Sequence, residues 1–229
     1  MSKIVFDDEY VIVVPTFEEV QTHKHSFYHM FFLDEGKGID KVKIVGGNAI
    51  HTMPSLEICR IFIMIDPTSN LAECLRDYVL KDEEIKTVDL KKCLDFSDDM
   101  DEEEIRESVS KCIDLNGYKR NFETDKFDDY RIVKLVKEIR DYAHLEEKVH
   151  NIADEYNLSE SRLSHAFKEC MGVSLKGYLS LKQVEYAYKL ILSGKTITFA
   201  AMEAGFATPS HLAAKCKNEM GISISDVMK

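Results

Sequence analysis

Two similar nine-residue stretches in the last third of the chain constrain its fold more than any other feature. They are Met171–Leu179 and Met220–Met228, and they begin 49 residues apart. Both open with Met-Gly, a branched apolar residue and Ser. Each follows a pattern of two short helices joined by a tight turn. The chain is therefore predicted to contain one small helical unit twice, and two such units can contact successive major-groove segments of one DNA site.

Each predicted unit has the residue types that two closely crossing helices require. Ala153 and Ala201 are the small residues expected in the first helix of each unit. Ser159 is a good N-cap for the second helix of the first unit, and Gly172 and Gly221 are expected to end the two second helices. The inward apolar positions of the second helices are Leu163, Phe167, Leu212 and Cys216.

A long amphipathic segment, Leu175–Ser193, separates the two units. Its 19 residues would form a helix about 28 Å long at 1.5 Å per residue. With its flanking turns, such a helix can hold two recognition helices about 34 Å apart, which is one turn of DNA. A plain helical bundle would explain a single unit equally well, but the repetition and the spacer favour DNA binding.

A set of residues between positions 130 and 229 carries a resemblance to a known family. The residues are Ile152, Ala153, Leu158, Ser159, Leu163, Ala166, Phe167, Lys168, Gly172, Val173, Ser174, Tyr178, Leu179, Ile197, Ala201, Gly205, Phe206, Ser210, Leu212, Lys217, Gly221, Ile222 and Ser223. In this order they resemble the DNA-binding domain of the AraC/XylS family of bacterial transcription regulators. The resemblance implies seven helices, a central linker helix, and double-stranded DNA as the partner.

The outward positions of the two second helices supply the candidate DNA contacts. Arg162 and His165 can donate to guanine or to phosphate. Ala213 and Ala214 cannot hydrogen-bond a base edge, and the position of Ala214 is often Arg in the family. The second unit is therefore expected to contribute mainly shape, backbone and phosphate contacts. The candidate DNA-binding residues are Ser159, Ser161, Arg162, Ser164, His165, Lys168, Ser210, His211, Lys215 and Lys217.

Charge is distributed unevenly along the chain. The net charge of −11 lies entirely in the first 144 residues, because residues 145–229 contain ten basic and ten acidic side chains. Neutralisation of phosphates supplies most of the non-specific affinity for DNA, so a neutral half attracts DNA less than a basic domain would. A regulator that acts by protein contact, with weakened DNA binding, therefore stays open as an alternative.

The first 80 residues are predicted to form strands around a histidine cluster. Residues 4–66 contain β-branched and aromatic runs that are punctuated by glycine and proline. Within them His23, His25 and His29 resemble the first cupin motif, and His51 stands where the second motif places its last ligand. Alternation along the strands places His23, His25 and His29 on one face. These imidazoles could bind Zn²⁺, Fe²⁺ or Ni²⁺, or could be purely structural.

The predicted architecture is α+β. A small, truncated cupin-like β-barrel over residues 1–80 serves as a sensor or dimerisation domain. An acidic helical connector follows over residues 81–128, and an all-α domain with two helix-turn-helix units over residues 129–229. The truncation is expected because the segment between the two cupin motifs is short, and the segment from Asn116 to Asp125 is the best candidate linker.

Several classes of function receive no support from the sequence. No catalytic constellation is present, the short glycine pairs cannot form a phosphate loop, and the six cysteines have no CxxC spacing. No apolar run approaches the ~20 residues of a membrane span, and no signal peptide precedes the strands. We therefore expect a cytoplasmic transcription regulator, not an enzyme. Its expected partners are DNA, RNA polymerase, a small-molecule effector and a second copy of itself. The rival is a metal-binding cupin sensor or enzyme with a vestigial helical tail.

Overall fold

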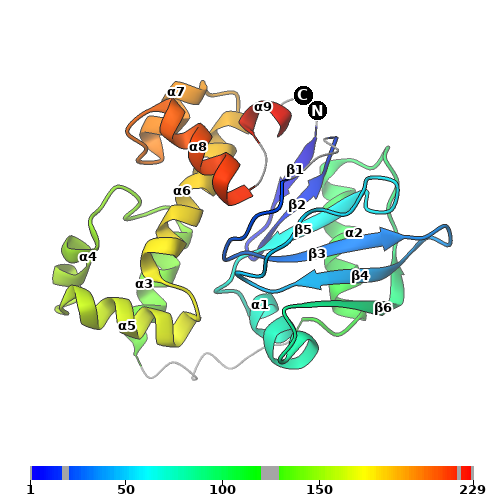
Figure 1. Cartoon of the computed structure of the whole chain (residues 1–229), viewed down its shortest axis with the longest axis horizontal. Coiled ribbons are helices and arrows are strands. Elements are labelled where there is room, and N and C mark those ends of the chain that lie inside the picture. The colour runs from blue at the N-terminus through cyan, green and yellow to red at the C-terminus, as the bar shows by residue number, and fades with distance from the viewer. Residues whose placement is uncertain (1, 17–20, 120–128, 221–222, 228–229) are drawn as a thin grey trace. The chain divides into compact units, whose positions relative to one another are not determined.

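The computed structural model describes residues 2–16, 21–119, 129–220 and 223–227. The chain divides into two compact units, residues 1–122 with 219–229, and residues 123–218. The first is built on a β-sheet and the second is helical (Figure 1). The expected α+β class is therefore confirmed. None of the helices among the described residues is long and apolar enough to cross a membrane.

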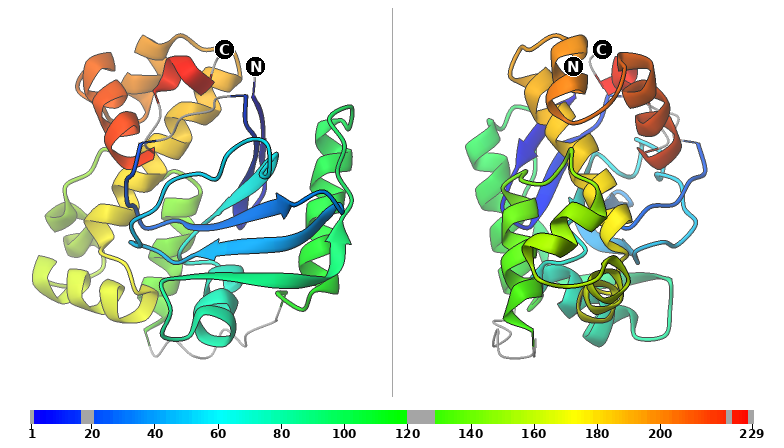
Figure 2. Two further views of the ribbon diagram at one scale, coloured as in Figure 1. Left: turned by 45° about the vertical axis from the view of Figure 1, so that its right-hand side comes forward. Right: turned by 90° about the vertical axis from the view of Figure 1, so that its left-hand side faces the viewer.

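Six strands of the first unit form one antiparallel sheet in the order β1-β2-β5-β3-β4-β6 (Figure 2). The predicted strand runs all lie in this sheet. Among the described residues this sheet is open, with β1 and β6 at its edges. The strands are β1 (Lys3–Phe6), β2 (Tyr10–Val14), β3 (Tyr28–Asp34), β4 (Ile39–Val45), β5 (Ile61–Ile65) and β6 (Ile85–Leu94).

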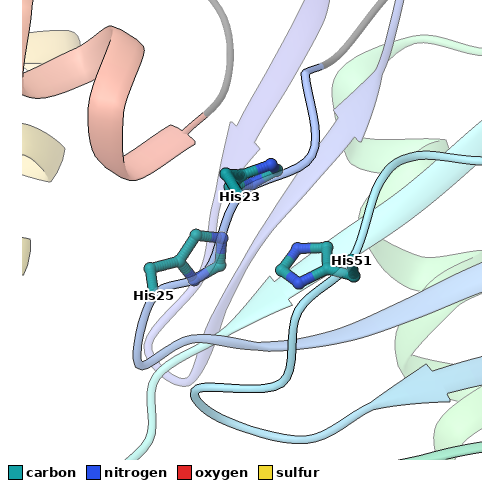
Figure 3. Close-up of side chains that lie close together, drawn as sticks. All are labelled: His23, His25 and His51. Carbon is teal, nitrogen blue, oxygen red and sulfur yellow. The ribbon is translucent and has the colours of Figure 1, made fainter.

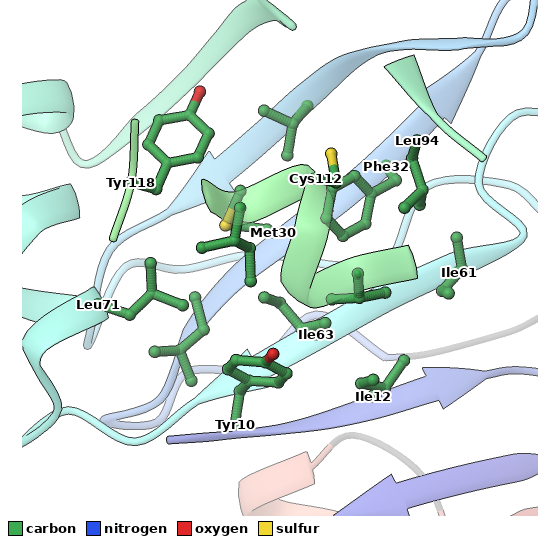
Figure 4. Packing of buried hydrophobic residues seen from close by; sticks show 14 of the residues in the cluster. Tyr10, Ile12, Met30, Phe32, Ile61, Ile63, Leu71, Leu94, Cys112 and Tyr118 are labelled. Atoms are coloured by element: carbon green, nitrogen blue, oxygen red, sulfur yellow. The ribbon is translucent and has the colours of Figure 1, made fainter. Parts of the chain in front are cut away.

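Helix α2 (Glu102–Leu115) packs against one face of this sheet and completes its hydrophobic core. Asp101 starts the helix through a capping box, in which its side chain accepts from the Glu104 N–H while the Glu104 side chain accepts from the Asp101 N–H. Figure 4 shows Cys112 of this helix among Met30 and Phe32 of β3. A fully buried apolar side chain contributes about 1.5–3 kcal/mol, so this face anchors the helix. The buried residues of α2 are Ile105, Val109, Cys112 and Ile113, as the sequence predicts.

The helical connector expected over residues 81–128 needs correction. Strand β6 lies within it and pairs with β4, and the apolar face of α2 belongs to the sheet core. Asn116, expected at the start of a linker, is buried and joins these two elements, because its side-chain amide donates to the Lys92 carbonyl and its oxygen accepts from the Lys91 N–H. The described part of the connector therefore belongs to the sheet unit, and residues 120–128 lie outside the described residues.

Short helical segments follow β5. Ser69 caps helix α1 (Asn70–Cys74), accepting from the Ala72 N–H, and the chain continues as a π-helical turn over Leu75–Leu80. Leu71 and Leu75 are buried in the same core as α2. These turns carry the chain from the end of β5 towards the start of β6.

Residues 129–227 contain the repeated helical pattern that the sequence predicts. Ser159 caps α5 by accepting from the Arg162 N–H, and Gly172 ends it in the left-handed conformation, with φ of 73°. Gly221 is expected to end the second helix of the second helix-turn-helix unit, but it lies outside the described residues. The linker helix ends one residue before its predicted bound. Among the described residues from 129 onward there are seven helices, of which α9 and the end of α8 are grouped with the first compact unit: α3 (Tyr130–Arg140), α4 (Val149–Glu155), α5 (Glu160–Met171), α6 (Leu175–Leu192), α7 (Ile197–Glu203), α8 (Pro209–Met220) and α9 (Ile224–Val227).

Candidate nucleic-acid interface

The turns of the two helix-turn-helix units, α4–α5 and α7–α8, are built in the same way. Asn157 and Gly205 both have positive φ, of 55° and 81°, and each lies four residues after a buried alanine. The next residue closes the turn in both units, because the Leu158 N–H donates to the Ala153 carbonyl and the Phe206 N–H donates to the Ala201 carbonyl. The buried alanines leave room for the second helix to cross closely, as the sequence predicts.

The second turn is one residue longer before its helix begins. The Thr208 hydroxyl accepts from the His211 N–H at 3.1 Å and takes the role that Ser159 has in the first unit. Pro209 then opens α8, where its fixed φ fits and its missing N–H costs no helical bond. From there on, positions in α8 correspond to positions 49 residues earlier in α5. Leu163 and Phe167, and their counterparts Leu212 and Cys216, are all completely buried.

The outward face of α5 is polar and hydrogen-bonding. Ser161, Arg162, His165 and Lys168 are exposed, while Ser164 is half-buried. Ser159 is exposed as well, but its hydroxyl is occupied as the helix cap. Exposed donors on a helix that follows a tight turn are the groups that can contact base edges and phosphates in a major groove.

Acidic side chains lie on the same helix. The Nδ1 of His165 is 3.5 Å from a carboxylate oxygen of Glu169, and Glu160 forms an exposed ion pair with Lys176. Such exposed pairs are worth little to stability, but they reduce the positive potential of the face. These pairs agree with the neutral charge balance of residues 145–229.

The outward face of α8 has fewer hydrogen-bonding side chains. Ser210, His211 and Lys217 are exposed and Lys215 is half-buried, but Ala213 and Ala214 occupy the centre of the face and are exposed. They correspond to Ser164 and His165 of the first unit. The ring of His211 packs edge-on against Phe206 with centroids 5.4 Å apart, so one of the few polar side chains here rests on the turn.

Contacts that the sequence did not predict connect the linker helix α6 to both units. Gln183 of α6 donates from Nε2 to the Leu145 carbonyl, at 2.6 Å, in the loop before α4. Gly205 lies against both groups, because an added Cβ there would stand 2.9 Å from the Gln183 Nε2 and 3.2 Å from the Leu145 oxygen. The glycine was recognised as a turn residue, but nothing in the sequence around Gln183 indicates its partner.

A second group of contacts fixes the loop between α3 and α4. Lys182 and Glu185 form a nearly buried ion pair on α6, and the Tyr142 hydroxyl donates to the same carboxylate. In the loop itself, His144 bonds to Glu138 at 3.1 Å and to Glu147 at 2.9 Å. Burial lowers the pKa of His144, but these two carboxylates outweigh it and the net shift is upward.

The four histidines that the sequence groups together lie close to one another in the sheet unit. His29 belongs to β3, on the face of the sheet opposite the α2 core, where its ring stacks on Phe31. Its ring centroid lies 4.9 Å from that of His25 and 4.7 Å from that of His51, and the His23 and His51 centroids are 4.5 Å apart. Figure 3 shows His23, His25 and His51 directed towards one another.

Comparison with known proteins agrees with this geometry. Residues 152–229 match the family model of a helix-turn-helix domain. ToxT from Vibrio cholerae has a similar structure, with 17% identity, a TM-score of 0.51, and coverage of 96% of this chain and 97% of that one. ToxT with a bound unsaturated fatty acid gives 17% identity and a TM-score of 0.50 over 97% of this chain and 95% of that one. No curated protein matches the sequence.

These findings define the class of the C-terminal domain. The matched family model and the paired turns identify residues 152–229 as an AraC-type helix-turn-helix domain. The resemblance predicted from the sequence is thereby confirmed for this domain. The likeness to ToxT extends over nearly the whole chain and concerns its fold.

Proposed function

We propose that the protein binds a DNA site with two unequal halves, in which α5 reads bases and α8 mainly holds the backbone. The proposal rests on the observation that Ala213 and Ala214 of α8 occupy the positions of Ser164 and His165 in α5, on helices whose inward positions are buried alike. A methyl group can contact thymine but cannot donate to or accept from a base edge. Hydrogen-bond discrimination between bases is therefore concentrated in one half of the site.

In the first half, Arg162 and His165 are the residues that read bases. A guanidinium donates in a fixed fork that matches the two acceptors of guanine, and a bidentate contact of this kind discriminates by about 1–3 kcal/mol. Ser161, Ser164 and Lys168 surround them as contacts to phosphate or base. Ser159 acts by fixing the start of α5, whose free N–H groups can donate hydrogen bonds to a phosphate oxygen.

In the second half, the contacts are to the DNA backbone. Ser210, Lys215 and Lys217 supply phosphate contacts, and His211 is positioned by Phe206. Phosphate contacts set the orientation of a protein on the duplex without selecting a sequence. The second unit thus fixes the register of the first unit on the duplex.

The N-terminal unit is proposed to make this binding responsive to a small molecule. ToxT has been crystallised with an unsaturated fatty acid and with (E)-4-(8-methylnaphthalen-1-yl)but-3-enoic acid, which supports ligand response in a protein of this fold. Contact with RNA polymerase and pairing with a second copy of the chain complete the proposal, since a regulator must communicate with the transcription machinery.

The proposal is tested by selecting binding sites from random duplex DNA and measuring affinities for the selected site. Wild type is compared with Arg162→Ala, and Arg76→Ala serves as control because Arg76 is an exposed arginine of the sheet unit. We expect a selected consensus and a loss of about 5–150-fold for Arg162→Ala, with the control unchanged. Failure to select any sequence at low salt would favour a regulator that acts by protein contact.

A further inference from the structure

The histidine cluster is fixed by the backbone on two sides. His23 and His51 form an isolated antiparallel bridge in which each N–H donates to the carbonyl of the other, both at 3.0 Å. The Asn48 N–H also donates to the His25 carbonyl at 2.7 Å. The three imidazoles that Figure 3 draws therefore start from backbone positions that hydrogen bonds hold in place.

The ring nitrogens of this cluster are close enough to share one ion. One nitrogen from each of His23, His25 and His51 lies within 4.8 Å of the others. Around Zn²⁺, with bonds of 2.0–2.1 Å, tetrahedral ligand nitrogens stand about 3.3 Å apart. Binding of an ion therefore requires these nitrogens to move closer together.

Hydrogen bonds at the far side of two rings orient their lone pairs. The Nδ1 of His23 lies 2.7 Å from the Gln21 carbonyl, and the Nδ1 of His51 lies 2.9 Å from the Ala49 carbonyl. A carbonyl only accepts, so Nδ1 carries the proton in each ring and Nε2 keeps a free lone pair. Donation from the non-ligating nitrogen to a carbonyl is the usual arrangement around metal-bound histidine.

The cluster also contains buried nitrogens without partners. They are the Nε2 of His51 and the Nδ1 of His25. The Nε2 atoms of His25 and His29 lie 3.1 Å apart and share one proton. Buried polar atoms are rarely left unpaired, and a group of them in one place calls for an explanation such as a bound ion.

The rings are packed closely and shielded from water. Burial, then the neighbouring histidines, lowers the pKa of His25 to about 3, and the pKa of His29 is lowered for the same reasons.

We propose that His23, His25 and His51 form a three-histidine site for a divalent transition metal ion of the zinc class. Three neutral imidazoles suit a borderline ion such as Zn²⁺ better than a hard ion, which prefers oxygen ligands. His29 is a positioning residue, because it contacts His25. With three protein ligands, the fourth position takes water or an anion, as in open zinc sites. His23 is the most exposed of the three and leaves a side of the site near solvent.

The test measures metal binding directly on the full chain after removal of metals with a chelator. Zn²⁺ is titrated by calorimetry, and Co²⁺ is used as a spectroscopic substitute, since a low-coordinate nitrogen site gives intense visible absorption. We expect one ion per chain in wild type, no binding in His51→Ala, and about 10–100-fold weaker binding in His29→Ala. The control is His144→Gln. It disrupts the second possible metal-binding group among the described residues, which consists of His144, Glu147 and Glu155.

Two results would overturn the proposal. The first is wild type that binds no Co²⁺ with a visible band, which needs no variant and so does not depend on folding of a mutant. The second is stoichiometric binding that survives in a folded His51→Ala protein but is lost in His144→Gln. Neither result depends on DNA binding, so failure of the metal site and failure of the proposed regulatory function are distinguishable.

Discussion

The two helix-turn-helix units have the same framework and different faces. Leu163 and Leu212 are completely buried at equivalent positions, and the turns close with the same hydrogen bond to a buried alanine. Two positions of the outward faces differ strongly, with Ser164 and His165 in one unit and Ala213 and Ala214 in the other. Packing restricts which residues can occupy the inward positions, while the outward positions are restricted only by the surface that they contact. This difference is the basis of our proposal that α5 recognises the DNA sequence.

The largest expected effect tests whether the frameworks are equivalent. Leu163→Ala and Leu212→Ala each remove a fully buried side chain and leave a cavity, and each should cost about 2–5 kcal/mol of unfolding free energy. Chemical denaturation of the full chain, with helix content and tyrosine fluorescence as probes, measures both. A cost below about 1 kcal/mol in one variant alone would show that only one unit has a packed core.

The next effect separates the two faces at matched positions. Arg162 corresponds to His211, so Arg162→Ala and His211→Ala form a pair. Arg162→Ala should weaken binding to the selected site by about 1–3 kcal/mol and relax preference at one base position. His211→Ala should weaken specific and non-specific binding alike. Equal affinity of wild type and Arg162→Ala for the selected site would refute the assigned role.

A smaller effect comes from exchanging the residues that distinguish the faces. His165→Ala makes α5 resemble α8, and it should weaken sequence-specific binding more than Ala213→Ser or Ala214→Ser changes it. Competition with selected and scrambled duplexes measures the difference. If Ala214→Ser alters affinity as much as His165→Ala does, the two halves contribute equally and the asymmetry is wrong.

The smallest effect concerns pH and the loop between α3 and α4, which precedes the first helix-turn-helix unit. Glu138 and Glu147 raise the net pKa of His144 despite its burial, and Glu155 also faces it. A raised histidine pKa adds stability that is fully present below about 6.5, the unfolded value, and is lost as pH rises through the folded value. The difference in melting temperature between wild type and His144→Gln should therefore shrink as pH rises. A difference that stays constant or grows would contradict this linkage.

Much of the helical half is predictable because its signals are local. Ser159 before an apolar stripe and Gly172 after it set the bounds of α5, and capping depends only on neighbouring residues. The acidic start of α2 is readable for the same reason, since Asp101 and Glu104 cap each other.

The parts that the sequence did not predict depend on distant partners. Strand β6 is an edge strand whose lysines and aspartate face solvent, so its alternation is weak and its acidic surroundings resemble a helix. The contact of Gln183 with the Leu145 carbonyl joins residues 38 positions apart. The histidines could be grouped from their motif spacing, but the His23–His51 bridge that orients them is a tertiary contact.

The central claim is that one unit reads bases and the other holds the backbone. The most direct measurement is a base-by-base substitution scan of the selected DNA site, with the affinity of wild-type protein determined for every single-base variant. We expect one half in which substitutions cost about 1–3 kcal/mol each and a second half in which they cost much less. Two equally sharp halves would contradict it.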